Sequence, residues 1–457
     1  MSAELNRRRF LQLTGAAGAA VAGGSLLSAC AGSAGSSAGE TEFWYAFTDT
    51  NDQKYFQQNF IDAYNATKPA AKAVMSVKQV STLDKLTQTA VASGQGPDII
   101  STSGPAEALN YEHAGNLLAL DAYVDKFRWT QAFQTWALSA GRVGGKLYSL
   151  PSEYETMAVF YNPATFAKHG WKPPATLAEF EAICEDAASK GIMPVGAGSA
   201  DWQAATEWHV SWLWNTYAGP KALYEALTGK RPWTDPVFVD AITMLKGWFG
   251  KGWFGGSTDD YFTNKFATLY QKLADGQSAM QFSGSWSFSE ILPYFGSAAG
   301  NNATWDWAPL PSMNTGVPAG VFPLSIGNTL SINKDSKNPD AAAAFLNYIT
   351  TGASRQLNAL AAVSQEPSPI VVTAGQFPVS VDPRVKRQYV DLAATKNYGY
   401  TTWTFWPAKT DTYINTEINK VLTGSLSPQA YCAGVESAFR QEFKAGSVPP
   451  IPPPTGA

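Results

Sequence analysis

The chain has 457 residues, of which 45% are hydrophobic, 13% aromatic and only 15% charged, and its formal net charge is −4. This length predicts two or more domains with a sizeable core. No lysine- or arginine-rich block stands out, which excludes the basic surface typical of nucleic-acid-binding proteins. The three histidines, His113, His169 and His209, lie far apart with no neighbouring ligand pattern, so we expect no metal site and no cofactor.

The N-terminal segment, residues 1–29, has the three parts of an export signal. Arg7 and Arg8 belong to a basic start that resembles the twin-arginine pattern, and a weakly apolar middle over 13–27 follows. That middle is shorter than the roughly 20 residues that a membrane-spanning helix needs. We therefore expect residues 1–29 to direct export and to be removed, so that the mature protein works outside the cytoplasm.

Residues 27–30, Leu-Ser-Ala-Cys, resemble the bacterial lipobox, in which the cysteine thiol receives a lipid and the chain is cut just before it. We expect Cys30 to anchor the protein to the outer face of the cytoplasmic membrane, with residues 30–40 as a flexible tether. The alternative is an uncleaved signal with a chance cysteine. Cys184 and Cys432 either form a disulfide, which an exported compartment permits, or remain two buried thiols.

Strands alternate with helices along the mature chain. The expected strands cover 41–47, 98–101, the parts of 145–163 on either side of Pro151, 192–198, the middle of 275–286, 305–311 and 328–333. The expected helices cover 50–67, 83–94, 176–188, 338–360, 411–424 and 427–443. Thr176 and Glu179 predict a capping box, and the tail over 446–457 is proline-rich and expected to be unpacked. This alternation is typical of an α/β fold.

Four stretches resemble one protein family in the same order and spacing. They are GQGPDII (94–100), the stretch from Tyr148 to Cys184, DGQSAMQFSGSW (275–286) and NPDAAAAFLNYITT (338–351). They resemble the extracellular solute-binding proteins of bacterial ABC importers, and specifically the carbohydrate-binding branch (family 1) that includes maltose-binding protein. The resemblance covers about residues 41–445, although the tryptophan-rich segment 200–262 does not align.

This resemblance implies two discontinuous α/β lobes joined by a hinge, with the ligand in the cleft between them, as in type II periplasmic binding proteins. We place the first lobe at 41–150 and 316–375, and the second at 151–315 and 376–445. The implied protein is a monomeric receptor without enzymatic activity. It binds a sugar or oligosaccharide and delivers it to a membrane permease.

Glu153 and Glu155 are the polar residues expected at the ligand. They follow Pro151 at the crossover between lobes and are two residues apart, which places both on one face of an extended segment. Their position resembles that of the family's carboxylate that binds sugar hydroxyls. A solvated strand face is the alternative, and a pair of glycosidase carboxylates would need a second carboxylate across the cleft that no pattern identifies.

Aromatic and small residues in loops at strand ends complete the expected site, because α/β folds bind ligands there. Trp286 matches the family's cleft tryptophan, and its neighbours Gly284 and Ser285 bring backbone N–H groups close. The other expected contacts are Asp49, Ser101, Ser103, Trp202, Trp403 and Phe322, the last in a turn. Trp208 and Trp212, four apart on a helix, favour a place in the core, with ligand contact as the alternative.

Two further functions remain open. Carboxylates beside aromatic rings could also hold a polyamine or a peptide amine, so the receptor could take a cationic ligand. An exported enzyme acting on carbohydrate fits the same residues. No arginine lies in the expected binding loops, so a phosphate or carboxylate ligand is not favoured.

Overall fold

The computed structural model describes residues 39–47, 50–79, 82–362 and 366–454. Cys30 and Asp49, the expected lipidation site and one expected ligand contact, lie outside these ranges, as does the export segment. Within the described ranges, no helix is both long and apolar enough to cross a lipid bilayer.

A five-stranded mixed sheet forms the centre of what we call the first lobe. Its order is β2 (Lys72–Lys78), β1 (Glu40–Ala46), β3 (Ile99–Thr102), β12 (Thr329–Ile332) and β6 (Ser149–Pro151). β1 runs parallel to β2 and β3, whereas β12 is antiparallel to β3 and β6. Thr102 and Thr329 pair although 227 positions separate them, so this lobe is built from two distant stretches of chain.

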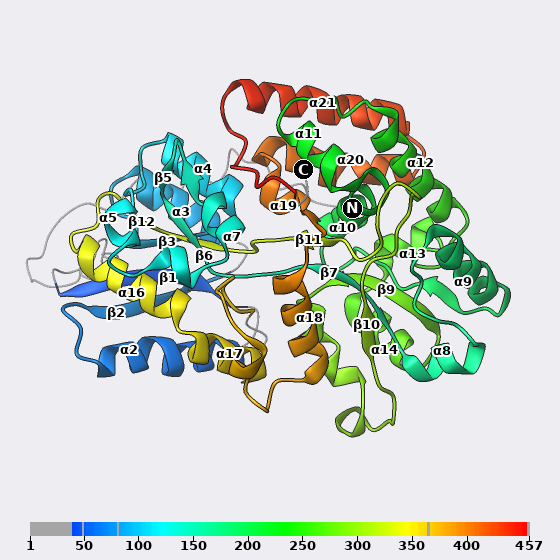
Figure 1. Cartoon of the computed structure of the whole chain (residues 1–457), viewed down its shortest axis with the longest axis horizontal. Coiled ribbons are helices and arrows are strands. Elements are labelled where there is room, and N and C mark those ends of the chain that lie inside the picture. Colours follow the sequence, from blue (N-terminus) through cyan, green and yellow to red (C-terminus); the bar gives the residue numbers. More distant parts are fainter. Residues whose placement is uncertain (1–38, 48–49, 80–81, 363–365, 455–457) are drawn as a thin grey trace, which may run out of the picture. The chain divides into compact units, whose positions relative to one another are not determined.

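Helices cover this sheet through apolar side chains such as Phe43, Phe60 and Phe345, all fully buried. Figure 1 shows α2 and α16 beside β1 and β2. The helices are α1 (Thr50–Phe56), the π-helical η2 (Gln57–Asp62), α2 (Ala63–Ala66), α3 (Leu83–Ala92), α4 (Pro105–His113), α5 (Asp121–Val124), α6 (Trp129–Ala132), α7 (Thr135–Ala140), α16 (Pro339–Thr351) and α17 (Ala353–Ala362). A small hairpin joins β4 (Arg142–Val143) to β5 (Lys146–Leu147).

The single helix expected over 338–360 is wrong. α16 ends at Thr351 and α17 begins at Ala353, because Gly352 between them has a non-helical ψ of 89°. Glycine is a poor helix former, and here it lets the chain change direction.

A four-stranded sheet forms the centre of the second lobe. Its order is β10 (Asp306–Ala308), β7 (Met157–Tyr161), β9 (Ser278–Gly284) and β8 (Met193–Val195). β7 is antiparallel to β9 and β10, and β8 is parallel to β9. Every residue of β9 is buried, which fits a central strand covered on both faces.

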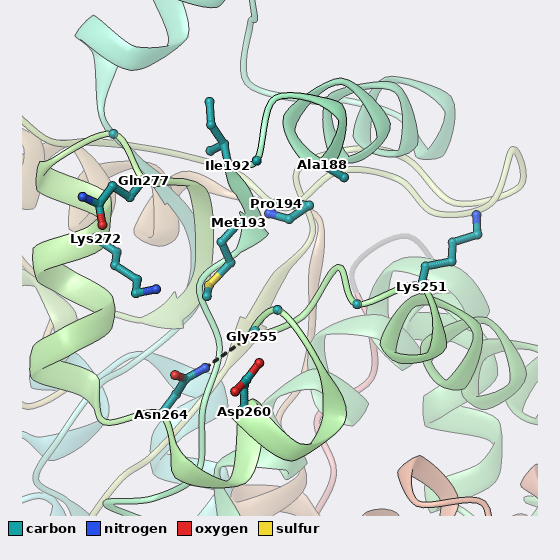
Figure 2. A pocket seen from close by; sticks show the side chains of 14 residues that line it. Ala188, Ile192, Met193, Pro194, Lys251, Gly255, Asp260, Asn264, Lys272 and Gln277 are labelled. Carbon is teal, nitrogen blue, oxygen red and sulfur yellow. Dashed lines mark hydrogen bonds between the residues drawn. The ribbon is translucent and has the colours of Figure 1, made fainter.

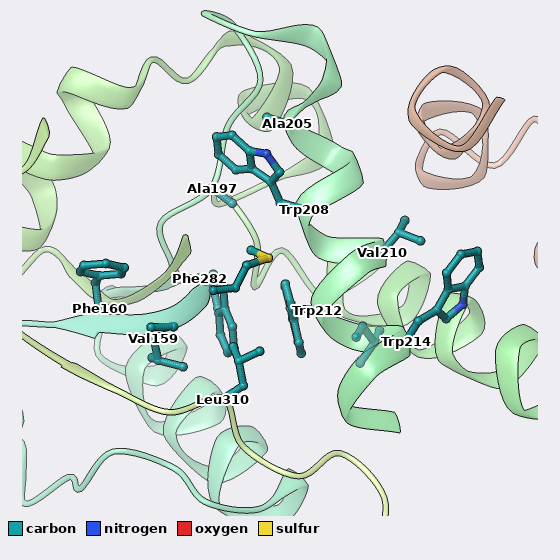
Figure 3. Close-up of a cluster of buried hydrophobic side chains, with 14 of the residues drawn as sticks. Val159, Phe160, Ala197, Ala205, Trp208, Val210, Trp212, Trp214, Phe282 and Leu310 are labelled. Atoms are coloured by element: carbon teal, nitrogen blue, oxygen red, sulfur yellow. The ribbon is translucent and has the colours of Figure 1, made fainter. Parts of the chain in front are cut away.

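Tryptophan and phenylalanine rings fill the core of the second lobe. Trp212 stacks on Phe282 with ring centroids 4.3 Å apart (Figure 3), and Trp214 stacks on Trp233 at 5.2 Å. The surrounding helices are α8 (Pro163–His169), α9 (Leu177–Ser189), η3 (Gln203–Ala205), α10 (Thr206–Leu213), η4 (Trp214–Ala218), α11 (Gly219–Leu227), α12 (Pro236–Gly250), α13 (Thr258–Thr263), α14 (Phe266–Ala274), α15 (Ser287–Glu290), η5 (Leu292–Tyr294), η6 (Ser297–Ala299), η7 (Ala374–Gln376), α18 (Pro383–Ala394), α19 (Thr402–Phe405), α20 (Ala408–Leu422) and α21 (Pro428–Lys444).

The C-terminal tail packs on the protein as far as residue 454, so the expectation that it is unpacked is wrong there. β13 (Tyr398–Tyr400), which pairs with β11 (Phe322–Leu324), presents its tyrosine hydroxyls to the tail. The Tyr400 hydroxyl donates a hydrogen bond to the Pro452 carbonyl at 2.6 Å, and Tyr398 donates one to Pro453. Val448 and Ile451 pack against the second-lobe core.

Two local expectations are confirmed. Thr176 and Glu179 form the capping box that begins α9. Of the two alternatives for Cys184 and Cys432, the structure has the buried free thiols, and burial raises the pKa of the Cys432 thiol to about 12. Such thiols are poor nucleophiles.

Candidate functional site

Two glutamates converge where the chain crosses from the first sheet to the second. Glu153 and Glu155 lie between β6 and β7, and Glu155 is bridged by backbone hydrogen bonds to Ser325. Both carboxylates approach Gly327. A Cβ placed on that residue would overlap Glu155 Oε1 and lie 3.1 Å from Glu153 Oε2, so glycine is needed for the two carboxylates to pack there.

Each carboxylate receives hydrogen bonds from side chains that are distant in sequence. The Tyr45 hydroxyl on β1 donates to Glu153 Oε1 at 2.8 Å. Ser325 Oγ donates to Glu155 Oε2 at 2.8 Å. Trp403 Nε1, on α19, lies 2.6 Å from Ser325 Oγ and 3.3 Å from Glu155 Oε2. The crossover therefore brings together β1, the β11–β12 connection and α19.

A third buried carboxyl, that of Glu366, joins this pair. Its side chain is only 8% exposed, and its Oε1 has no hydrogen-bond partner among the described residues. The neighbouring Ser368 hydroxyl donates to the Ser152 carbonyl at 3.1 Å, which ties this segment to the crossover. The sequence analysis missed Glu366, because no local pattern links it to a crossover more than 200 residues earlier.

The environment raises the pKa of all three carboxyl groups. Burial, and then the charge of Glu155, raise the pKa of Glu153 to about 7. Burial raises the pKa of Glu155, although hydrogen bonds to its carboxylate oppose the shift. Burial and the charge of Glu155 raise the pKa of Glu366 well above its usual range. No lysine, arginine or histidine among the described residues contributes to these pKa shifts.

A row of tryptophan rings leads away from these carboxylates. Trp403 lies 6.1 Å from Trp286 between ring centroids, Trp286 lies 5.0 Å from Trp208, and Trp208 lies 5.2 Å from Trp202. Trp202 is 45% exposed and Trp208 9%, while Trp286 and Trp403 are half-buried. Phe266 stacks on Trp208 at 5.5 Å. We call the four tryptophans the aromatic row.

The aromatic row unites three of the tryptophans that the sequence analysis selected and adds one that it had favoured as core. Trp208 is mostly buried, yet it connects Trp202 to Trp286, whereas Trp212 on the same helix is fully buried. Phe266 was missed. No spacing in the sequence links Phe266 to the tryptophans, and only its stacking on Trp208 in the structure does so.

The small residues selected from the sequence occupy different positions. Gly284 ends β9 against the Trp286 ring, where a Cβ would overlap the indole. Ser285 is buried, and its Oγ accepts a hydrogen bond from the Thr156 backbone at 3.3 Å. Ser101 Oγ donates to Asn328 at 2.9 Å.

The other two selected residues differ in their surroundings. Ser103 is exposed, and its backbone N–H donates to Glu107. Phe322 is not in a turn as expected. It lies on β11, only 6% exposed, with its ring edge-on to Trp307, because β11 pairs with β13 and directs it into the core.

A cavity of about 580 Å³ opens beside Glu366, and neither Glu153 nor Glu155 lines it. Glu366 and Ser285 line it, together with Asn51 and Asp52 of α1 and Tyr389 of α18. None of the four tryptophans of the aromatic row lines this cavity, although Trp286 directly follows Ser285 in the chain. Asn51 and Asp52 could have been found from the sequence, since they follow the first strand just after Asp49.

A second cavity, of about 650 Å³, lies in the second lobe between α9, α12, α14 and the β8 edge of the sheet (Figure 2). Its lining includes Lys251, Lys272 and Asp260, and the Asn264 side chain donates a hydrogen bond to the Gly255 carbonyl at 2.9 Å. None of the residues expected at the ligand lines it. Among the described residues, no group of histidine, cysteine and acidic side chains could hold a metal ion in either cavity.

Comparison with known proteins places these features in a family. Residues 48–355 match the family model described as bacterial extracellular solute-binding protein. The chain is 24% identical over 204 residues to a probable sugar-binding periplasmic protein of Brucella melitensis, which covers 44% of this chain and 47% of the relative. It is 24% identical over 322 residues to a maltotriose-binding protein of Pyrococcus abyssi, covering 68% of this chain and 63% of that protein.

The fold is shared with solved structures of this kind. A chitin oligosaccharide binding protein superposes with a TM-score of 0.72 at 22% identity, over 88% of this chain and 98% of the other. The matched stretch spans only about half the length of the first relative, so the sequence match concerns part of that protein. The family match, in contrast, covers most of the chain. The chain belongs to the bacterial extracellular solute-binding proteins and has their α/β fold.

Proposed function

We propose that this protein is the lipid-anchored substrate-binding component of an ABC importer, which captures a sugar or oligosaccharide in the cleft beside the aromatic row. The aromatic row next to buried carboxylates carries the proposal. The ligand names of the relatives, sugar, maltotriose and chitin oligosaccharide, support it. The protein binds and releases its ligand without covalent chemistry and hands it to a membrane permease.

The chemistry of the site suits a sugar. The C–H face of a sugar ring packs on an indole, and its hydroxyls need donors and acceptors once they are buried. Trp286 and Trp403 offer half-buried rings, and Glu155 and Ser325 offer oxygens beside them. With centroids 5–6 Å apart, the aromatic row is long enough for more than one sugar ring. Binding between two lobes also allows the ligand to close a hinge, which a permease can recognise.

A thermal-shift screen of the mature protein against a neutral carbohydrate library tests this function. We expect one sugar or oligosaccharide to raise the melting temperature saturably, because a ligand that binds only the folded state stabilises it. Spermidine serves as the cationic comparison. Stabilisation by spermidine and by no carbohydrate would overturn the sugar assignment, and hydrolysis of a library member would overturn the assignment as a receptor.

The membrane anchor is tested separately. We expect Cys30→Ala to release the protein from the membrane fraction, because it removes the proposed acylation point. Its ligand affinity should be unchanged, because the residues of the proposed ligand site are left intact. Fractionation of cells expressing either form measures this. A variant that stays with the membranes would favour an uncleaved signal instead.

A further inference from the structure

Three carboxyl groups share one small region of this site. Glu153 and Glu155 converge on Gly327, and the charges of both raise the pKa of Glu366. The charge of Glu366 in turn raises the pKa of Tyr389. Carboxylates buried together repel one another and lose hydration, which is costly unless a positive charge or hydrogen-bond donors compensate.

None of the described residues brings a positive charge to these carboxyls. The groups that interact with the three carboxyls are Tyr45, Ser325, Trp403, Ser285 and Tyr389, and the acidic Asp52 lies near Tyr45. All of them are neutral or acidic. None of the ion pairs formed by the described residues includes Glu153, Glu155 or Glu366.

A separate observation indicates that a ligand completes the group. Glu366 is nine-tenths buried, its Oε1 has no hydrogen-bond partner among the described residues, and its side chain lines the cavity of about 580 Å³. A buried carboxyl oxygen without a partner is unfavourable, and more so when it is charged. A donor that enters from the cavity would remove this cost.

The aromatic row ends at the same carboxyls. Trp403 donates from its indole nitrogen to Glu155 while its ring neighbours Trp286. A ligand whose rings stack along the row therefore reaches the carboxyls with its end. The faces of tryptophan rings also attract cations, so the row and the carboxyls favour the same charge.

We propose, building on the sugar-binding function above, that the ligand is an amino sugar or an oligosaccharide of amino sugars whose free ammonium group lies among Glu153, Glu155 and Glu366. The ammonium supplies a positive charge to all three carboxyls and a donor to Glu366 Oε1, which has none among the described residues. Its other N–H groups add to the donors that Glu153 and Glu155 already have from Tyr45, Ser325 and Trp403. The remaining rings stack on the aromatic row. A metal ion is not the expected occupant, because the described residues contain no suitable ligand group.

Isothermal titration calorimetry of the mature protein with glucosamine oligosaccharides and their N-acetylated counterparts tests this proposal. Acetylation keeps the sugar chain and removes the charge. We expect the free amines to bind at least about tenfold more tightly, since a charge-assisted hydrogen bond is worth more than a neutral one. Equal or tighter binding of the N-acetylated chains would overturn the proposal but leave the sugar-binding function standing. Binding of spermidine alone, with no sugar of either series, would overturn both.

Proton release provides a second readout. At about pH 7, the three carboxyls together hold protons, because the pKa of Glu153 is about 7 and that of Glu366 is raised. An entering ammonium would displace these protons. We expect the binding enthalpy of the amine to vary with the ionisation enthalpy of the buffer, and its affinity to fall at about pH 5 as the carboxyls are protonated. Binding of the amine without proton release and without weakening at low pH would contradict the assignment of its ammonium to these carboxyls.

Glu366→Gln locates the charge recognition. Glutamine keeps the shape of the side chain, so we expect affinity for the amine to fall by about tenfold and affinity for the N-acetylated chain to change by less than about twofold. Asp340→Asn, which neutralises a highly exposed carboxylate on α16, is the matched control and should change neither. An equal loss for both ligands would show a merely structural role. If Glu366→Gln does not fold, Glu153→Gln is the alternative variant.

Discussion

The core of the second lobe and the aromatic row beside it are built from the same kind of residue, yet they differ in what surrounds each ring. Trp212 and Trp208 lie one turn apart on α10. Trp212 is fully buried against Phe282 and donates its indole N–H to His209, whereas Trp208 lies between the exposed Trp202 and the half-buried Trp286. Rings that are surrounded by protein stabilise the fold, and the partly uncovered rings leave the surface that the proposed ligand would need.

The carboxyls sharpen this contrast. Burial keeps the pKa of His209 in the core low, at about 3, so the ring stays neutral and carries no unpaired charge. At the site, the half-buried Glu153 and Glu155 lie with the buried Glu366, whose Oε1 has no hydrogen-bond partner among the described residues. Such local instability is a feature of functional sites, because the ligand removes it. Variants in the core should therefore mainly lower the free energy of unfolding, and variants at the site should mainly lower ligand affinity.

The largest effect is expected in the core. Trp212→Ala removes the ring stacked on Phe282 and leaves His209 Nδ1 without its donor, so the free energy of unfolding should fall by about 3–5 kcal/mol. Denaturant unfolding measures it. A loss below about 1 kcal/mol would show that this part of the core is not tightly packed.

Trp286→Ala should affect ligand binding more than stability. The variant lacks a central ring of the aromatic row, so its affinity for the carbohydrate that gives the largest thermal shift should fall by about tenfold or more. Its loss of stability should be smaller than that of Trp212→Ala. Trp171→Ala is the control, because Trp171 is also half-buried but stacks on His169 away from the site. Unchanged affinity would remove Trp286 from the ligand site.

Glu153→Gln should change how stability depends on pH. The pKa of Glu153 is raised to about 7 in the folded protein, above its unfolded value, so the folded state holds this proton more tightly. The associated stability is complete below the unfolded pKa and is lost as the pH rises through about 7. The variant lacks this loss and should melt higher than the native protein at about pH 8, but not at about pH 4. Parallel melting curves across this range would place Glu153 in a solvated position.

The smallest effect is expected for Trp403→Phe. Phenylalanine keeps an aromatic face and removes the N–H that donates to Ser325 and Glu155, so ligand affinity should fall by about 1 kcal/mol. Trp403→Ala should cost more because it also removes the ring. If the two variants bind equally well, stacking on Trp403 contributes nothing.

Much of this molecule could be predicted because the signals are local. The alternation of strands and helices predicted the α/β fold, and Thr176 with Glu179 predicted the start of α9. The motifs around Glu153 and Trp286 predicted the family. Each of these depends on neighbours within a few residues, where spacing translates directly into geometry.

Only the tertiary structure decided which tryptophans form the row, and that Glu366 joins Glu153 and Glu155. It also placed Phe322 in the core and packed the proline-rich tail on Tyr400. These outcomes depend on contacts between segments up to hundreds of residues apart, which spacing along the chain does not encode. The sequence by itself determined the fold class and the family, because short stretches carry their signals. It also predicts export and lipidation, which stay predictions. The shape and charge of the site arose only when the distant segments packed together.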